Sequence, residues 1–216
     1  MPDDARTPTS PEGSAAGRRP RNARGEGDKL REEILQATLR LIADETRMSI
    51  VPLSLREVAR EAGVTAPAIY RHFADKEELS CTAVRVLFGQ LLDEMDRADR
   101  TSDGLPPARR LAELAHAYCR FAERNPASFH VMFADRDRHR NETARLAERW
   151  RGAVARLAET GMRTIQTPEA GAVAVWSAVH GRLLLDGGAG QMWSLGGIHD
   201  FVEELTRSLA TVDGAR

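Results

Sequence analysis

Side chains able to recognise nucleic acid are concentrated between Ser54 and Lys76, in the segment SLREVAREAGVTAPAIYRHFADK. Arg56 carries a guanidinium group, which can donate two parallel hydrogen bonds to the major-groove edge of guanine. Thr65 and Ala66 offer a hydroxyl and a methyl group, and the methyl group suits contact with the methyl of thymine. These residue types predict a surface that contacts the base edges of double-stranded DNA.

Two short helices are needed to present these side chains. The pattern predicts them at 55–62 and 66–73, joined by a turn at Gly63, and this arrangement is typical of a helix-turn-helix. Gly63 permits the turn because glycine adopts backbone conformations that are closed to other residues. Small side chains at Ala59 and Ala62 allow the two helices to approach closely. The expected core of this unit consists of Val58, Val64, Ile69 and Phe73.

Capping residues mark where these helices begin. Ser54 is followed three positions later by Glu57, which predicts a capping box at the first helix. Thr65 is expected to cap the second helix, and Asp75 the helix after it. Lys76 directly follows Asp75, where free backbone N–H groups and the helix dipole also favour a phosphate.

The longer segment LREVAREAGVTAPAIYRHFADKEEL resembles the DNA-binding domain of the TetR family of bacterial transcriptional regulators. The resemblance covers residues 28–88 and implies a three-helix domain that contains the helix-turn-helix. The remaining helical region is similar in size to the ligand-binding and dimerisation domain of that family. Trp176, His180 and Gly181 resemble the signature of its WHG subgroup.

The resemblance also implies a set of DNA contacts. Arg56 stands at a position that family members use on bases, although it could instead form a surface ion pair with Glu57. Lys76 could be an ordinary surface lysine, and Tyr70 could be a partly buried ring packed on Phe73. Phosphate contacts are implied for Tyr70, Arg71, His72 and Lys76. The complete expected set is Arg56, Thr65, Ala66, Pro67, Tyr70, Arg71, His72 and Lys76.

Charge and composition limit the class of protein. The 216 residues include 31 Lys and Arg against 32 Asp and Glu, a net charge of −1, which excludes a uniformly basic nucleic-acid-coating protein. Residues 1–27 are rich in proline and polar residues, which predicts disorder. This segment is either a solubilising tail or a basic arm that touches DNA through Arg18, Arg19, Arg21 and Arg24. With no apolar run long enough for a membrane span, we expect a cytoplasmic protein.

Helical periodicity without any useful strand pattern predicts an all-α protein of about nine helices. Residues 28–88 form the expected DNA-binding domain and residues 89–216 the larger ligand-binding and dimerisation domain. The polar segment 99–105 reads as a linker that follows the N-terminal module. The expected helices are 28–44, 55–62, 66–73, 76–98, 106–124, 127–133, 141–160, 168–186 and 198–210.

Large side chains in the C-terminal region suggest a small-molecule site, with ordinary core packing as the alternative for each. Trp176 and His180 are four residues apart and share a helix face, where their polar nitrogen atoms need partners. His116 and Cys119 lack a third ligand at a readable spacing, so we expect neither a metal nor another cofactor. The candidate pocket residues are Tyr118, Phe121, Phe129, Phe133, Trp150, Trp176 and His180.

Helices 168–186 and 198–210 are expected to form a four-helix bundle with those of a second copy. The expected interface residues are Leu183, Phe201, Val202, Leu205 and Leu209. The resulting hypothesis is a homodimeric repressor that binds a near-palindromic operator and is released by a small-molecule effector. Since the nucleophile, zinc-protease and nucleotide-binding motifs are all missing, the chain is not expected to be an enzyme. The alternative is a helical enzyme or small-molecule carrier with a vestigial helix-turn-helix.

Overall fold

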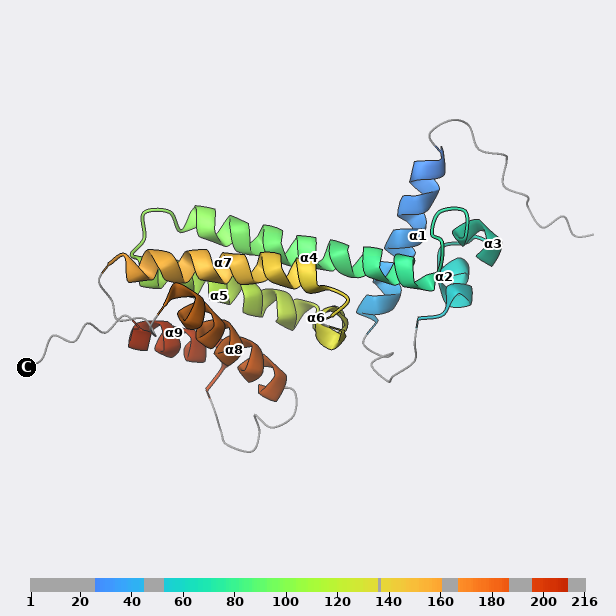
Figure 1. Ribbon diagram of the computed structural model, residues 1–216. Coiled ribbons are helices and arrows are strands. Elements are labelled where there is room, and N and C mark those ends of the chain that lie inside the picture. The colour runs from blue at the N-terminus through green and yellow to red at the C-terminus, as the bar shows by residue number, and fades with distance from the viewer. Residues whose placement is uncertain (1–25, 45–52, 136, 161–166, 187–195, 210–216) are drawn as a thin grey trace, which may run out of the picture.

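The computed structural model describes residues 26–44, 53–135, 137–160, 167–186 and 196–209. Within these ranges the chain is all-α and contains nine helices, as predicted (Figure 1). Much of the expected arm at 1–27, including its four arginines, lies outside the described residues. The helices are α1 Glu26–Ala43, α2 Leu55–Glu61, α3 Ala66–Ile69, α4 Lys76–Thr101, α5 Pro107–Arg124, α6 Pro126–Ala134, α7 Arg140–Ala158, α8 Pro168–Asp186 and α9 Ile198–Leu209.

Two hydrophobic clusters organise the chain, and α4 contributes residues to both of them. Figure 1 shows α4 extending from beside α1 and α2 along α7. The smaller cluster joins α1 to α2, α3 and the first turn of α4. It is built from Ile34, Val58, Ala59, Ile69, Phe73 and Leu79. The larger cluster begins at Ala83 on α4 and includes residues from α5 to α9. The change of cluster therefore falls inside a helix, which couples the two parts mechanically.

Helix α1 belongs to both clusters because its two apolar rows point in different directions. Ile34 is completely buried in the smaller cluster, whereas Leu35 and Leu39 pack in the larger one. Residues separated by three or four positions share a helix face, so adjacent rows can bury against different partners. Any rotation of α1 against the larger cluster would therefore also move the smaller one.

Two local expectations differ from the structure. Residues 99–105 do not separate two cores, because α4 continues to Thr101 and the larger cluster includes residues on both sides of the segment. Helix α3 ends at Ile69 rather than at 73. The backbone N–H of His72 donates to the carbonyl of Ile69 at 2.9 Å, a three-residue spacing that tightens the chain into turns. The side chains of 70–73 are therefore presented from turns instead of a regular α-helix.

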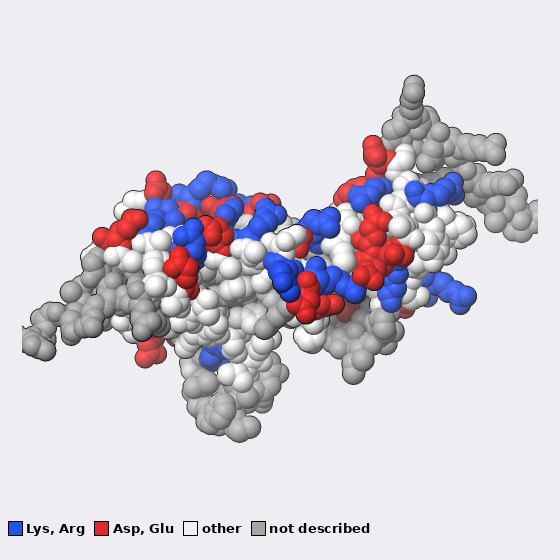
Figure 2. Space-filling view, viewed as in Figure 1, with Lys and Arg blue, Asp and Glu red and all other residues white. Residues whose placement is uncertain are grey.

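Charged side chains of both signs alternate along the visible surface of α4 and α7, while the surface over α8 carries few of them (Figure 2). Within the described ranges no helix is both long and apolar enough to cross a membrane.

Candidate functional site

The turn between α2 and α3 has the geometry expected of a helix-turn-helix. Gly63 adopts a φ of 65°, in the left-handed region that glycine enters at little cost. The backbone N–H of the next residue, Val64, donates to the carbonyl of Ala59 at 2.8 Å. Val58, Ile69 and Phe73 are buried in the smaller cluster as predicted, and Val64 packs against it. The turn thus sets the direction of α3 relative to α2.

Two of the three expected caps differ from the prediction. Ser54 and Thr65 occupy the N-cap positions of α2 and α3, but neither side chain makes a capping hydrogen bond. Asp75 does cap α4, since its Oδ1 accepts from the backbone N–H of Glu78 at 2.8 Å. In return, Glu78 Oε2 accepts from the backbone N–H of Ala74 at 2.6 Å, which completes a reciprocal capping pair. The start of α4 is therefore fixed firmly.

Most of the predicted DNA-contacting side chains share an exposed surface. Tyr70 is 57% exposed, so the alternative of a partly buried ring is wrong. Arg56, Arg71 and Lys76 are also exposed, and none of their side chains forms an ion pair with another residue of the described ranges. The alternative pairing of Arg56 with Glu57 is therefore not observed there. Thr65 and Pro67 are exposed as well, while Ala66 and His72 are half-buried.

A chain of hydrogen bonds joins three of the predicted pocket residues. The Nε1 of Trp176 donates to the hydroxyl oxygen of Tyr118 at 3.2 Å. That hydroxyl lies 2.7 Å from Nδ1 of His180. Burial raises the pKa of Tyr118 far above its ordinary value, so its hydroxyl stays protonated and can donate to His180. The polar groups of Trp176 and His180 therefore share one buried partner that comes from α5.

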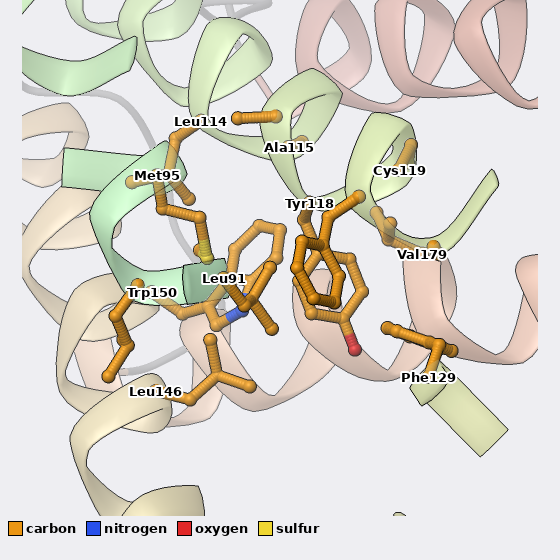
Figure 3. Packing of buried hydrophobic residues seen from close by; sticks show 14 of the residues in the cluster. Leu91, Met95, Leu114, Ala115, Tyr118, Cys119, Phe129, Leu146, Trp150 and Val179 are labelled. Atoms are coloured by element: carbon orange, nitrogen blue, oxygen red, sulfur yellow. The ribbon is translucent and has the colours of Figure 1, made fainter. Parts of the chain in front are cut away.

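Other aromatic rings pack against Tyr118, and Figure 3 shows Trp150 and Phe129 beside it. Tyr118 makes edge contacts with Phe129 and Trp150, at centroid distances of 5.4 and 5.5 Å. The ring of His180 lies 4.6 Å from that of Phe133. Six of the seven predicted pocket residues are thus brought together from α5, α6, α7 and α8. The seventh, Phe121, is buried in the same core but makes no ring contact with the six in the described chain.

Trp150 adds an unusual feature to this aromatic cluster. Its side chain is completely buried, yet its Nε1 has no hydrogen-bond partner among the described residues. Burying an N–H group without a partner costs about 1–3 kcal/mol. The group is therefore well placed to donate to an acceptor on a bound molecule.

A polar cavity of about 300 Å³ lies between α4, α5 and α7. Arg149 pairs there with both carboxylate oxygens of Asp96, and Asp99 accepts from Arg110 and Arg156. Most of these charged groups pair with one another, but Nε of Arg110 and Nε of Arg156 are buried without a hydrogen-bond partner among the described residues.

The predicted interface residues differ in their exposure. Val202 is 0% exposed in the single chain, so it has no surface left for a partner, and its assignment to an interface is corrected. Leu183, Phe201, Leu205 and Leu209 are only partly buried against the core. Sequence reasoning missed the most exposed apolar side chains of α8, which are Val173, Leu184 and Leu185.

Sequence reasoning also missed a cluster of titratable groups between α5 and α9. His116 meets His199 and Glu203 there, and His199 also contacts Glu123. Cys119, which was considered beside His116 for its spacing, makes no hydrogen bond in this cluster, and within the described ranges no three such side chains are placed to hold a metal ion. No sequence signal could have found this cluster, because its members on α5 and α9 are about 80 residues apart.

An exposed helix-turn-helix attached to a larger all-helical body defines the class as a helix-turn-helix DNA-binding protein. Residues 34–80 match the family model described as bacterial regulatory proteins, tetR family. Residues 111–209 match the model described as tetracyclin repressor-like, C-terminal domain. Together the two matches span about two thirds of the chain. The chain belongs to the TetR family of transcriptional regulators.

Solved structures share the fold. A protein of unknown function from Rhodococcus sp. is 22% identical, with a TM-score of 0.70 over 84% of this chain and 93% of its own. A transcriptional regulator from Rhodococcus sp. is 23% identical, with a TM-score of 0.63 over 84% and 98%. The multidrug binding protein EbrR, solved in complex with imidazole, is 20% identical, with a TM-score of 0.59 over 85% and 96%.

Proposed function

We propose that this TetR-family regulator is a cytoplasmic homodimeric repressor that binds a near-palindromic operator and is released by a small-molecule effector. The observation that carries the proposal is the exposed surface from α2 to the start of α4, where Arg56, Arg71 and Lys76 have no ion-pair partner in the described chain. Charges left without a partner on a protein surface are available for a polyanion. We further propose residues 28–88 as the DNA-binding domain, 89–216 as the effector and dimerisation domain, and the WHG subgroup on the basis of Trp176, His180 and Gly181.

Arg56 and the start of α3 would contact bases, whereas residues 70–76 would contact the phosphate backbone. Arg56 stands in the first turn of α2 and can reach guanine, while Thr65, Ala66 and Pro67 at the start of α3 would contact neighbouring base edges. Arg71 and Lys76, together with Tyr70 and His72, would hold the backbone phosphates. The start of α4 supports Lys76 in this role, because the helix dipole favours an anion there even though the N–H of Glu78 is already bound by the Asp75 cap. Base contacts would then specify the sequence, and phosphate contacts would set the register.

The DNA contacts are tested by fluorescence anisotropy with the duplex that flanks the chain's own gene. We expect saturable binding to one near-palindromic segment, which weakens steeply between about 50 and 200 mM salt. Arg56→Ala should reduce the affinity at least about tenfold and relax the preference at one base pair in each half-site, since a bidentate contact contributes about 1–3 kcal/mol. Arg100→Ala, an equal change of charge at the far end of α4, is the control. Equal loss in both variants would contradict the assignment of Arg56.

The dimer face is proposed on the exposed side of α8 together with α9. Val173 and Leu184 on α8 are 62% and 58% exposed. The visible surface over α8 carries few charged side chains (Figure 2). Exposed apolar side chains that line one helix face mark an association surface. Gly181 lies between them in the sequence, and a Cβ built there would meet nothing within 4 Å. A helix of a second copy could therefore approach α8 closely at this glycine. Leu183, Phe201, Leu205 and Leu209 would complete the interface from their partly buried positions.

The aromatic cluster is the proposed effector site. Tyr118, Phe129, Phe133, Trp150, Trp176 and His180 combine ring faces with a few polar groups, the usual composition of a small-molecule site. Because Nε1 of Trp150 has no hydrogen-bond partner in the described chain, an effector that carries a hydrogen-bond acceptor would satisfy it. The complex of the related EbrR with imidazole is consistent with a ring-shaped ligand in this fold. An apolar, planar molecule with one acceptor fits these observations best.

A route from this cluster to DNA is available through α6. Phe129 and Phe133 lie on α6, which packs against α1, and Phe133 also contacts Phe88 of α4 at 5.5 Å. Because α1 and α4 both enter the smaller cluster, a shift of α6 would reorient α3. An effector that fits the shifted state better would lower the affinity for DNA by its difference in binding free energy.

The effector site is tested with 8-anilinonaphthalene-1-sulfonate as an aromatic probe. We expect it to bind the wild type and to weaken the operator complex. The double variant Trp176→Phe with His180→Phe should lower its affinity at least about tenfold, since the hydroxyl of Tyr118 loses both of these hydrogen-bond partners in the cluster. His130→Phe, an exposed histidine on α6, serves as the control. Unchanged probe binding and release in the double variant would place the effector site elsewhere.

A further inference from the structure

Two histidines from distant parts of the chain meet between α5 and α9. His116 and His199 face each other through their Nδ1 atoms, which are 2.7 Å apart. Their ring centroids are separated by 4.9 Å. The ring of His116 is largely buried, whereas that of His199 is 43% exposed. The contact belongs neither to the proposed DNA surface nor to the aromatic cluster.

A carboxylate holds the outer nitrogen atom of each ring. Nε2 of His116 lies 3.1 Å from Glu203, and Nε2 of His199 lies 3.1 Å from Glu123. The hydrogen bond with His116 is the main cause that lowers the pKa of Glu203, so this carboxyl is ionised at neutral pH. Arg109, 2.6 Å from Glu203, acts in the same direction. Since an ionised carboxylate can only accept hydrogen bonds, both Nε2 atoms must carry a proton.

The hydrogen bond between the two Nδ1 atoms requires a proton beyond those of two neutral rings. Two neutral rings have one proton each, and the carboxylates already place both of these on Nε2. The bond between the two Nδ1 atoms then needs a third proton, which lies on one ring and is accepted by the other. A metal ion would need more room, because two nitrogen ligands at about 2.0 Å in a tetrahedral site lie about 3.3 Å apart. The observed 2.7 Å fits a proton.

We propose that His116 and His199 bind one proton between them and that this proton clamps α9 onto α5. The chain of contacts then runs from Glu123 through both rings to Glu203 and carries a single positive charge between two carboxylates. When the shared proton is lost, the two neutral rings hold only two protons for three hydrogen bonds. Either the two Nδ1 atoms then face each other without a proton, or one Nε2 faces its carboxylate without one, and that hydrogen bond is lost. A second added proton makes two N–H groups face each other, and the central link breaks. The docking of α9 is therefore tightest in the singly protonated state.

Charged and titratable groups on both α5 and α9 lie near the pair in the described chain. Helix α5 contributes Arg109, Glu123, Cys119 and Arg120, and α9 contributes Glu203 and Arg207. The thiol of Cys119 is not ionised, because burial raises its pKa to about 12. Arg109 and Arg207 both lower the pKa of Glu203. The proposal for His116 and His199 does not depend on the proposed function. Only an effect on a dimer formed through α9 would rest on the proposed function.

Hydrogen exchange of the full-length chain tests the clamp. The measurement compares α9 amides with α4 amides, corrected for intrinsic exchange rates, in a buffer that contains EDTA. Raising the pH from about 6 to about 8.5 should reduce the protection of α9 at least about fivefold in the wild type, the equivalent of one lost hydrogen bond. His199→Gln should remove this pH dependence, and His130→Gln should retain it. Equal pH dependence in the wild type and His199→Gln would overturn the proposal.

Imidazole ¹⁵N NMR of the wild type tests the proton directly and does not depend on the folding of a variant. We expect both rings to carry a proton on Nε2 and to share one additional proton on the Nδ1 atoms near pH 6. Two neutral rings, one of them protonated only at Nδ1, would overturn the proposal. Operator binding is measured separately, so a failed clamp and a failed assignment as a repressor give different results.

Discussion

Phe73→Ala is expected to unfold the DNA-binding module while α5 to α9 remain folded. Phe73 is 1% exposed and is the largest side chain of the smaller cluster, and the guanidinium of Arg31 lies over its ring at 4.6 Å. Replacing a buried phenylalanine by alanine lowers the free energy of unfolding by about 3–5 kcal/mol. A core of six buried residues has little further contact with which to absorb such a loss. Operator binding should therefore disappear.

Two measurements distinguish this outcome from general unfolding. Urea denaturation followed by circular dichroism should show a separate, earlier transition in Phe73→Ala, and sedimentation should show that its self-association is retained. The control is Tyr70→Ala, which removes an exposed ring three residues earlier and should change the stability by no more than about 0.5 kcal/mol. A single cooperative transition in Phe73→Ala, lowered for the entire chain, would show that α4 joins the two clusters into one folding unit.

Leu184→Glu is expected to convert the proposed dimer into a monomer. Leu184 is 58% exposed on α8, so the substitution creates no cavity in the single chain. In a two-fold interface the same residue occurs twice, and each copy would bring an unpaired carboxylate out of water. Together the two copies should raise the dissociation constant of the dimer at least about 100-fold, because each costs more than about 1.4 kcal/mol.

Sedimentation equilibrium at micromolar concentration checks this expectation, with operator affinity as a second readout. Leu105→Glu makes the same chemical change at an exposed leucine in the turn between α4 and α5, so it should remain dimeric. If Leu184→Glu dimerises as tightly as Leu105→Glu, the interface lies on another face. If the wild type itself is monomeric at these concentrations, a homodimer is not the form that binds DNA.

The sequence by itself determined the features that depend on neighbours within one or two turns. Helical periodicity located all nine helices of the described chain to within a few residues, with α3 the main exception. The motif around Gly63 predicted the turn, and Asp75 was correctly predicted to cap α4. These features depend on backbone geometry and on residues three or four positions apart, which a single sequence displays directly.

Tertiary structure decided which surfaces those helices bury. Val202 was predicted at an interface but is enclosed by its own chain, whereas Leu184 is exposed, because apolar spacing shows that a face is buried without showing against what. Even the capping position of Ser54 did not ensure a hydrogen bond, since its side chain makes none to the backbone of α2. The direction of each helix face depends on the packing of all the others.

The polar contacts depend most strongly on tertiary structure. Tyr118 meets His180 across 62 positions of the chain, and His116 meets His199 across 83. A hydrogen bond requires its two atoms within a few tenths of an ångström, and only the packed arrangement of α5, α8 and α9 sets such distances. The residue types suggested polar chemistry, but the number of protons that the His116 and His199 pair must hold follows only from which nitrogen atom faces which carboxylate.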